Sequence, residues 1–280
     1  MQLISEEQWT QEIEKLERET KPATKEQLKE IILKTIQKLI PKEKFGVFLS
    51  GGVDSSFIAM MCKQFGGNFI CYSVGLKGAP DIDAAKKIAQ QFGLQHRIKE
   101  YSIGEAEELF KKTVKLLNDT NVVTIGVASV VYAAVELAKE NNVVKLFSGI
   151  GSEEIFAGYD RHSKATDKHA ECWRGLKAMW QRDLVRDITL MKKLGFEAIA
   201  PFLDNDVIKT AMGIDISRKI NKEQKKIILR EIAEECRLPK EIAWRDKKAA
   251  QYGSWLDKAM EKLAKKNKFE TKGEYLKSLL

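Results

Sequence analysis

The stretch SGGVDSS at residues 50–56 decides the fold, because it follows the apolar run FGVFL and opens a helical pattern. Glycines and hydroxyls at a strand-to-helix junction form a turn whose backbone N–H groups and side chains bind phosphate. The stretch has neither the lysine of the GxxxxGKS/T loop nor the spacing of GxGxxG. Asp54 would repel bare phosphate, so its presence predicts a magnesium ion that joins its carboxylate to the phosphate oxygens.

Outward from this stretch, short apolar runs alternate with helical patterns. We expect strands at 45–49, 69–74, 95–99 and 143–148, and helices at 53–65, 81–93, 104–118 and 125–141. This alternation predicts an α/β fold, a doubly wound parallel sheet with helices on both of its faces. The ligands of such sheets bind at the carboxyl ends of the strands.

The composition is that of a water-soluble globular protein, with 44% hydrophobic and 31% charged residues in a chain of 280. No stretch approaches the roughly 20 apolar residues of a membrane span, and the start MQLISEEQW lacks the layout of a signal peptide, so we expect a cytoplasmic protein. The net charge of +8 suits anionic substrates or nucleic acid. The cysteines are widely spaced, which disfavours a zinc site or a disulfide framework; they are Cys62, Cys71, Cys172 and Cys236.

A second polar loop, in LFSGIGSEEIFAGY at 146–159, again places glycine, serine and carboxylate after an expected strand. Three further segments are SVGLKGAPDIDAAKKIA at 73–89, FEAIAPFLD at 196–204 and LREIAEECRLPKEIAWRDKKA at 229–249. In these collinear segments the chain resembles the synthetase domain of glutamine-dependent asparagine synthetases over roughly residues 24–258, and it is similar to the β-lactam synthetases. The resemblance implies the PP-loop ATP pyrophosphatase fold, which is adenine nucleotide α-hydrolase-like.

The resemblance also implies an organisation and a chemistry. N-terminal helices at 1–40 would pack on an ATP-binding α/β core at 41–160, and a helical part at 161–280 would complete the active site. Past residue 158 we expect no further strand. Enzymes of this family cleave ATP between the α and β phosphates, adenylate a substrate oxygen and transfer nitrogen, so ATP and Mg²⁺ are the expected cofactors.

The roles of single residues come from the same resemblance. Asp54 and Glu153 correspond to magnesium ligands, and Lys247 in WRDKKA corresponds to a lysine that neutralises charge at the α-phosphorus. The expected catalytic residues are Lys247, Glu153 and Asp183. The expected ATP-binding residues are Leu49, Ser50, Gly51, Gly52, Val53, Asp54, Ser55, Ser56, Val74, Gly149 and Lys226.

Three departures from the family pattern bear on the acceptor substrate. Ile150 stands where asparagine synthetases have a glutamate that helps to deprotonate the attacking ammonia, and isoleucine cannot accept a proton. Asp183 aligns approximately with a second acidic residue that can serve instead. TIGVAS at 124–129 lacks one arginine, and Ile199 replaces another. These changes point away from aspartate as the acceptor.

The sequence shows no glutaminase domain ahead of these segments, and no cysteine follows Met1. We therefore expect the nitrogen to come from free ammonia, an amine substrate or a separate amidotransferase subunit. The favoured hypothesis is an AMP-forming carbon–nitrogen ligase that resembles asparagine synthetase. The alternatives are a PP-loop ATP pyrophosphatase that modifies RNA, an ATP-binding protein that has lost amide synthesis, and a purely structural module.

Overall fold

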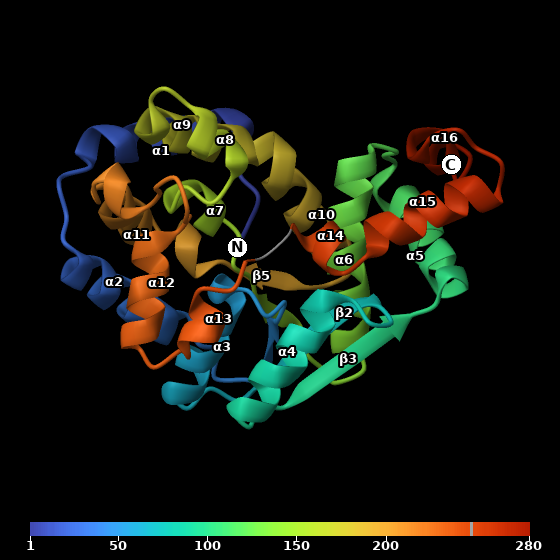
Figure 1. The fold of residues 1–280 in the computed structure, drawn as a ribbon, viewed down its shortest axis with the longest axis horizontal. Helices are drawn as coiled ribbons and strands as arrows, with labels where there is room; N and C mark the ends of the chain where they lie inside the picture. The colour runs from blue at the N-terminus through green and yellow to red at the C-terminus, as the bar shows by residue number, and fades with distance from the viewer. Residues whose placement is uncertain (247–248) are drawn as a thin grey trace.

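The computed structural model describes residues 1–246 and 249–280. Within these residues, five parallel strands form one sheet in the order β3-β2-β1-β4-β5, with helices on both faces (Figure 1). The strands are β1 Phe45–Phe48, β2 Phe69–Leu76, β3 His96–Tyr101, β4 Lys145–Phe147 and β5 Glu197–Ile199. The sheet grows in opposite directions from β1, so a ligand is expected in the crevice between the ends of β1 and β4. The predicted doubly wound parallel sheet is confirmed.

Strand β5 contradicts the expectation that no strand follows residue 158. It has three residues, which is too short for an alternating pattern to be recognised in the sequence. Ala198 pairs with Leu146 of β4, and the N–H of Ser148 donates to the carbonyl of Ile199 at 2.8 Å. The part of the chain expected to be helical therefore contributes the edge of the sheet, and only pairing with β4 defines it as a strand.

Helices surround the sheet and make up most of the rest of the described chain (Figure 1). In chain order they are α1 Glu6–Glu19, α2 Lys25–Leu39, α3 Val53–Gln64, α4 Pro80–Gln91, α5 Ile103–Leu117, α6 Val122–Lys139, α7 Ser152–Ile155, α8 Asp160–Lys164, α9 Lys168–Met179, α10 Val185–Lys193, α11 Asn205–Met212, α12 Ile227–Glu235, α13 Lys240–Ala243, α14 Ala250–Gly253, α15 Leu256–Lys266 and α16 Lys272–Lys277. Three shorter elements are the π-helical η1 Trp180–Leu184 and the 3₁₀ turns η2 Pro201–Leu203 and η3 Ile216–Arg218.

Both faces of the sheet are buried. Every residue of β2 is buried, as expected for a parallel strand covered on both sides. Val47 and Cys71 belong to a core cluster with α2, α3 and α4, whereas Ile70 and Tyr72 belong to a second cluster with α5, α6 and α15. Successive residues of β2 thus alternate between two separate cores.

Helix α6 is apolar and long enough to cross a membrane by length and composition alone, although half of its most hydrophobic window is buried inside the structure. Asn121 caps its first turn by accepting from the N–H groups of Val123 and Thr124, each at 3.0 Å. Buried residues such as Ala128 and Val135 belong to the core shared with β2 and α5. Helix α6 therefore packs as a core helix of this fold.

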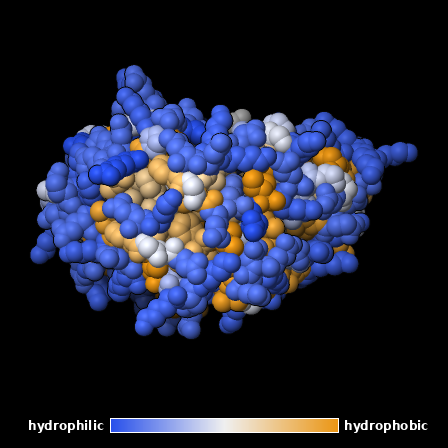
Figure 2. All heavy atoms as spheres, turned by 90° about the horizontal axis from the view of Figure 1, so that it is seen from below, coloured by the Kyte–Doolittle hydropathy of each residue, from blue (hydrophilic) through white to orange (hydrophobic). Residues whose placement is uncertain are grey.

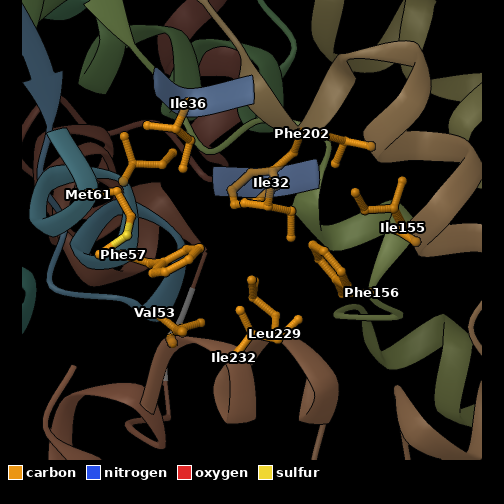
Figure 3. Close-up of a cluster of buried hydrophobic side chains, with 14 of the residues drawn as sticks. Ile32, Ile36, Val53, Phe57, Met61, Ile155, Phe156, Phe202, Leu229 and Ile232 are labelled. Carbon is orange, nitrogen blue, oxygen red and sulfur yellow. The ribbon is translucent and has the colours of Figure 1, made fainter. Parts of the chain in front are cut away.

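A cluster of buried side chains from α2, α3, α7, η2 and α12 joins distant parts of the chain (Figure 3). Phe57 of α3 and Leu229 of α12 are both fully buried there. Helix α3 begins with Val53 and Asp54, and α12 begins directly after Lys226. Packing in this cluster therefore fixes the starts of the two helices relative to each other.

The surface is mainly hydrophilic. On the face at the bottom of Figure 1, polar residues surround a smaller group of hydrophobic ones near the middle (Figure 2). Among the described residues, the exposed large hydrophobic side chains are Val123, Val144, Tyr252 and Leu280. Surface ion pairs such as Lys34 with Glu30 contribute about 0–1 kcal/mol each, so the stability depends chiefly on the two cores.

Lys219 is fully buried and contacts the sulfur of Met212 at 3.6 Å. Burial lowers its pKa to about 8 from an ordinary value of 10.5. Between these two values the unfolded chain binds a proton that the folded chain does not, so this lysine makes the stability rise with pH through that window. At pH 7 the buried charge lowers the stability.

We expect Leu229→Ala to lower the free energy of unfolding by about 2–5 kcal/mol, because it removes a fully buried side chain and leaves a cavity. Leu280→Ala makes the same chemical change at a side chain that is 65% exposed, and it should alter the free energy by less than about 0.5 kcal/mol. Urea unfolding followed by tryptophan fluorescence measures both. Equal effects of the two substitutions would contradict the assignment of Leu229 to the core.

We expect Lys219→Met to raise the free energy of unfolding at pH 7 by roughly 1–3 kcal/mol, since one pKa unit corresponds to about 1.4 kcal/mol. The variant should also lack the increase in stability between pH 8 and pH 10 that we expect for the wild type. Lys222→Met, at an exposed lysine, is the matched control and should keep that increase. Denaturant unfolding at several pH values gives both results, and identical pH profiles for all three proteins would refute the expectation.

Candidate active site

The two glycine-rich loops are in contact at the carboxyl ends of β1 and β4, which pair directly. A Cβ atom added to Gly149 would lie 2.9 Å from Cβ of Asp54, so the second loop packs against the first. Gly51 has a φ of +73°, and a Cβ atom there would lie 2.5 Å from that of Ala84 in α4. Only glycine fits this turn, which brings the start of α3 close to α4.

The ammonium group of Lys226 joins the carboxylates of the two loops. Its Nζ lies 2.9 and 2.8 Å from the two carboxylate oxygens of Asp54, 2.7 Å from Oε1 of Glu153 and 3.1 Å from Oγ of Ser152. Asp54 and Lys226 are each 5% exposed. Burial alone would lower the pKa of Lys226, but the charges and hydrogen bonds of the two carboxylates more than offset this effect, and the pKa is raised. The lysine therefore stays charged.

The local backbone allows this close approach. Lys226 has a φ of +56° and stands immediately before α12, which is anchored in the hydrophobic cluster of Figure 3. A Cβ atom added to Gly158 would lie 1.8 Å from Oε2 of Glu153 and 2.5 Å from Cε of Lys226. A glycine at 158 is thus required for the carboxylate and the lysine stem to meet.

A cavity of about 120 Å³ adjoins this charge cluster. Its lining contains four cationic side chains, Lys225, Lys226, Arg230 and Arg245, and four carboxylates, Asp54, Glu153, Glu223 and Asp246. Lysine and arginine groups beside oxygen ligands for a metal suit the binding of a polyphosphate.

Two arginines attach the C-terminal segment to the first loop. Arg230 donates to the carbonyls of Lys225, Ala243 and Arg245 at 2.8, 2.7 and 3.1 Å. Arg245 donates to the carbonyl of Ser50 at 3.4 Å and pairs with Asp81 at 3.1 Å. The sequence singled out the segment at 229–249 but gave these arginines no role, because their partners are defined only by the folded chain.

A larger cavity of about 280 Å³ opens on the same sheet edge. Most of the predicted site residues line one of the two cavities: Leu49, Ser50, Val53, Asp54, Ser55, Val74, Gly149, Glu153, Asp183 and Lys226. Gly51 and Gly52 are buried in the turn. Ser56 is fully buried, and its hydroxyl donates to the carbonyl of Gly52 at 2.7 Å, so it supports the helix start. Lys247 lies outside the described residues.

The structure adds lining residues that the sequence did not single out. Phe48 lies on the α6 side of β1 and lines the larger cavity, as do Ser148, directly after β4, and Ser73, in the interior of β2. Ser73 is held by a hydrogen bond of 2.8 Å between its Oγ and Nε2 of His96. Position at a strand end is the signal that could have identified Phe48 and Ser148, whereas Ser73 lies three residues before the end of β2.

Asp183 lies in the π-helical element η1 and faces the larger cavity with Ile150. Nε of Arg182 donates to its Oδ2 at 2.7 Å, and Nη2 of Arg186 lies 3.4 Å from its Oδ1. A π-helical turn inside a longer helix often marks a functional site. The predicted acidic residue is therefore in the cavity, where two arginines hold it in place.

Glu154 is a further carboxylate of this cavity that the sequence analysis did not assign. It is 1% exposed, accepts a hydrogen bond from Arg182 and lies 3.5 Å from Nη2 of Arg161. Burial raises its pKa to about 7, although Arg182 acts in the opposite direction. Its neighbour in the SEE sequence, Glu153, points to Lys226 instead, so the two glutamates have different surroundings.

The donor set fits a magnesium ion that is bound together with phosphate. Asp54 and Glu153 offer hard oxygen ligands on either side of a position that already holds one positive charge. Among the described residues, no group of three or more His, Cys, Asp or Glu side chains could hold a metal alone. Magnesium commonly takes one or two carboxylates together with substrate phosphates, and it would neutralise charge on the phosphate oxygens.

Comparison with known proteins agrees with this geometry. A family model described as asparagine synthase matches residues 27–175 and 164–277, which is most of the chain. The chain belongs to the asparagine synthase family.

Among curated members of the asparagine synthase family, the nodule asparagine synthetase of Pisum sativum, a glutamine-hydrolyzing protein, is 34% identical over 82% of this chain and 43% of its own length. A protein of Methanocaldococcus jannaschii, named as a glutamine-hydrolyzing asparagine synthetase, is 31% identical over 88% of this chain and 51% of its own. The chain spans about half the length of the curated relatives that it matches.

Among solved structures, the match to the NMN synthetase of Francisella tularensis spans 90% of this chain and 91% of the synthetase chain. The TM-score is 0.47 and the sequence identity is 13%. The NH₃-dependent NAD synthetase of Campylobacter jejuni covers 49% of this chain and 61% of its own, with a TM-score of 0.37 and 17% identity.

We expect Lys226→Met to lower the free energy of unfolding by about 3 kcal/mol, because it removes a buried cation from between two carboxylates. Added MgCl₂ should recover part of this loss, since an ion that binds the folded carboxylates stabilises the folded state. Lys225→Met is the matched control, because Lys225 pairs with the exposed Asp160. Denaturant unfolding with and without magnesium measures the effects, and equal losses in the two variants would count against the central role of Lys226.

Proposed function

We propose that the protein is a synthetase that consumes ATP and magnesium, forms AMP and pyrophosphate, and transfers nitrogen to a carboxyl or carbonyl group. The observation that carries this proposal is the buried cluster of Lys226 with Asp54 and Glu153, beside a cavity lined by further cations. An aspartate in a phosphate-binding loop needs a cation to offset its charge. The family membership supports ATP use and ligase chemistry.

In the proposed reaction, a carboxylate oxygen forms a bond to the α-phosphorus while the bond to the bridging oxygen of the β-phosphate breaks, and pyrophosphate leaves. An amine or ammonia nitrogen then attacks the activated carbon, AMP leaves with the bonding electron pair, and a base accepts the proton from nitrogen. Ser50, Ser55 and the cations of the smaller cavity support pyrophosphate binding. Leu49 and Val74 offer an apolar surface for the base of the nucleotide.

The base for the second step is proposed to be Asp183, since Ile150 in the same cavity cannot accept a proton. Glu154 lines the same cavity, and burial raises its pKa to about 7, so we propose that it assists Asp183 in accepting the proton. We assign Lys247 to charge neutralisation at the α-phosphorus on the family resemblance alone. The nitrogen is proposed to come from ammonia, an amine or a separate amidotransferase subunit. The reaction is proposed to take place in the cytoplasm.

One alternative has an observation in its favour. Ile150 lines the larger cavity at the position of the family's glutamate, which fits an ATP-binding protein that has lost amide synthesis.

The burial of two cysteines disfavours a second alternative, the transfer of sulfur to RNA. Cys62 and Cys71 are buried, and burial raises the pKa of both thiols, that of Cys71 to about 12. Such thiols are poor nucleophiles at neutral pH.

The proposal is tested by incubating the protein with α-labelled ATP, magnesium, ammonium and a panel of carboxylic acids. Labelled AMP should form with a suitable acid, in step with pyrophosphate. Asp54→Asn should reduce the affinity for magnesium-ATP at least tenfold, whereas Asp206→Asn, at an exposed carboxylate that lines neither cavity, should leave it unchanged. Formation of ADP in place of AMP, or full ATP affinity in Asp54→Asn, would overturn the proposal.

A further inference from the structure

The ammonium group of Lys226 lies between the two carboxylates that a metal ion would join. Its Nζ is 2.8 Å from Oδ2 of Asp54 and 2.7 Å from Oε1 of Glu153, so it bridges the two proposed magnesium ligands. An ion bound to the same two oxygens would lie beside this ammonium group. Two neighbouring cations in a buried position repel each other, so the lysine and a metal compete for the carboxylates.

The other cationic side chains of the smaller cavity are held by different partners. Lys225 and Arg245 pair with carboxylates outside the proposed metal ligands, and Arg230 donates to three backbone carbonyls. Among the described residues that line this cavity, Lys226 is therefore the one cation whose salt-bridge partners are the proposed metal ligands. A metal that binds there takes the partners of this lysine and leaves those of the other cations in place.

The backbone and the stem of Lys226 are held in place. The residue immediately precedes α12, whose Leu229 and Ile232 are fully buried in the cluster of Figure 3. Its stem packs so closely on Gly158 that a Cβ atom added there would lie 2.5 Å from Cε of the lysine. A new partner must therefore come to the ammonium group from the smaller cavity, which Lys226 lines.

The charges of the cluster set a condition on metal binding. Two carboxylates and one ammonium group carry one net negative charge. A divalent cation that took both carboxylates would leave the ammonium group of Lys226 buried without an anionic partner, which is costly. A polyphosphate in the smaller cavity removes this cost, because its oxygens accept hydrogen bonds from the lysine and also bind the metal. The metal and the polyphosphate thus favour each other's binding.

We propose that Lys226 excludes divalent cations from Asp54 and Glu153 until a polyphosphate binds, and that its ammonium group then passes from the carboxylates to the phosphate oxygens. The inference rests on the proposed function in one respect, since it takes the polyphosphate chain of ATP to be the anion that the smaller cavity binds. The protein accordingly binds magnesium together with the nucleotide and not before it.

The first test measures the affinity of the nucleotide-free protein for Mn²⁺, which suits the same oxygen ligands as magnesium. Electron paramagnetic resonance reports the unbound ion. Lys226→Met should bind Mn²⁺ at least tenfold more tightly than the wild type, because the carboxylates lose the cation that competes for them. Lys225→Met is the matched control: it removes a cation from the same cavity that pairs with the exposed Asp160, and it should stay within about threefold of the wild type.

A second test uses the wild type alone, so it decides the matter even if Lys226→Met does not fold. Denaturant unfolding is followed at constant ionic strength with MgCl₂, with inorganic pyrophosphate and with both. We expect MgCl₂ alone to leave the unfolding midpoint unchanged, because the lysine holds the carboxylates. The two together should raise the midpoint by more than the sum of their separate effects.

Three results would overturn the inference. They are Mn²⁺ affinities that are equal in the wild type and Lys226→Met, equal gains in Lys226→Met and Lys225→Met, and a midpoint that MgCl₂ alone raises as much as MgCl₂ with pyrophosphate does, including no shift in either.

Failure of the proposed function has a different sign. If ATP yields ADP in place of AMP while the Mn²⁺ and midpoint results are as expected, the proposed function fails and the role of Lys226 stands. If the wild type binds Mn²⁺ tightly without nucleotide but AMP is formed, the role of Lys226 is overturned and the proposed function stands.

Discussion

The structure depends on the charge cluster in which the ammonium of Lys226 holds Asp54 and Glu153 together. These residues come from three segments that are far apart in the chain, and they meet in a largely buried position. Burial of isolated charges is costly, so the three groups must be placed within hydrogen-bond distance of one another. The hydrophobic cluster of Figure 3 supplies this placement, because it packs the helix that follows Asp54 against the helix that follows Lys226.

This cluster also separates two chemical environments on one sheet edge. On one side, Lys225, Arg230 and Arg245 line the smaller cavity together with Glu223 and Asp246. On the other, valines of α6 and the carboxylates of η1 and α10 line the larger cavity. Under the proposed function, the polyphosphate lies at the smaller cavity, while the base of the nucleotide and the acceptor share the larger one. Arg230 and Arg245 keep the boundary fixed, since they bind backbone carbonyls of both the C-terminal segment and the first loop.

The residues that line the two cavities of this chain differ in how strongly the fold constrains them. The two glycine-rich loops carry glycine, serine and carboxylate, and they pack so closely that a Cβ atom added to Gly149 would lie 2.9 Å from Cβ of Asp54. The wall on the acceptor side carries Ile150 and the valines of α6. Side chains on this wall line a cavity and are not locked into the sheet, so their chemistry can change without loss of the fold.

The sequence by itself determined the α/β class, four of the five strands of the described chain and the two loops, because glycine turns and buried parallel strands leave strong local patterns. Most of the residues that it predicted for the site line one of the two cavities, although other residues make up most of the lining. Only the tertiary structure decided that β5 completes the sheet, that Ser56 supports a helix start, and that Glu154, Arg186, Arg230 and Arg245 belong to the site. The physical reason is that a three-residue edge strand, a buried carboxylate and an arginine bound to distant carbonyls are defined by partners far away in the chain, which no local pattern records.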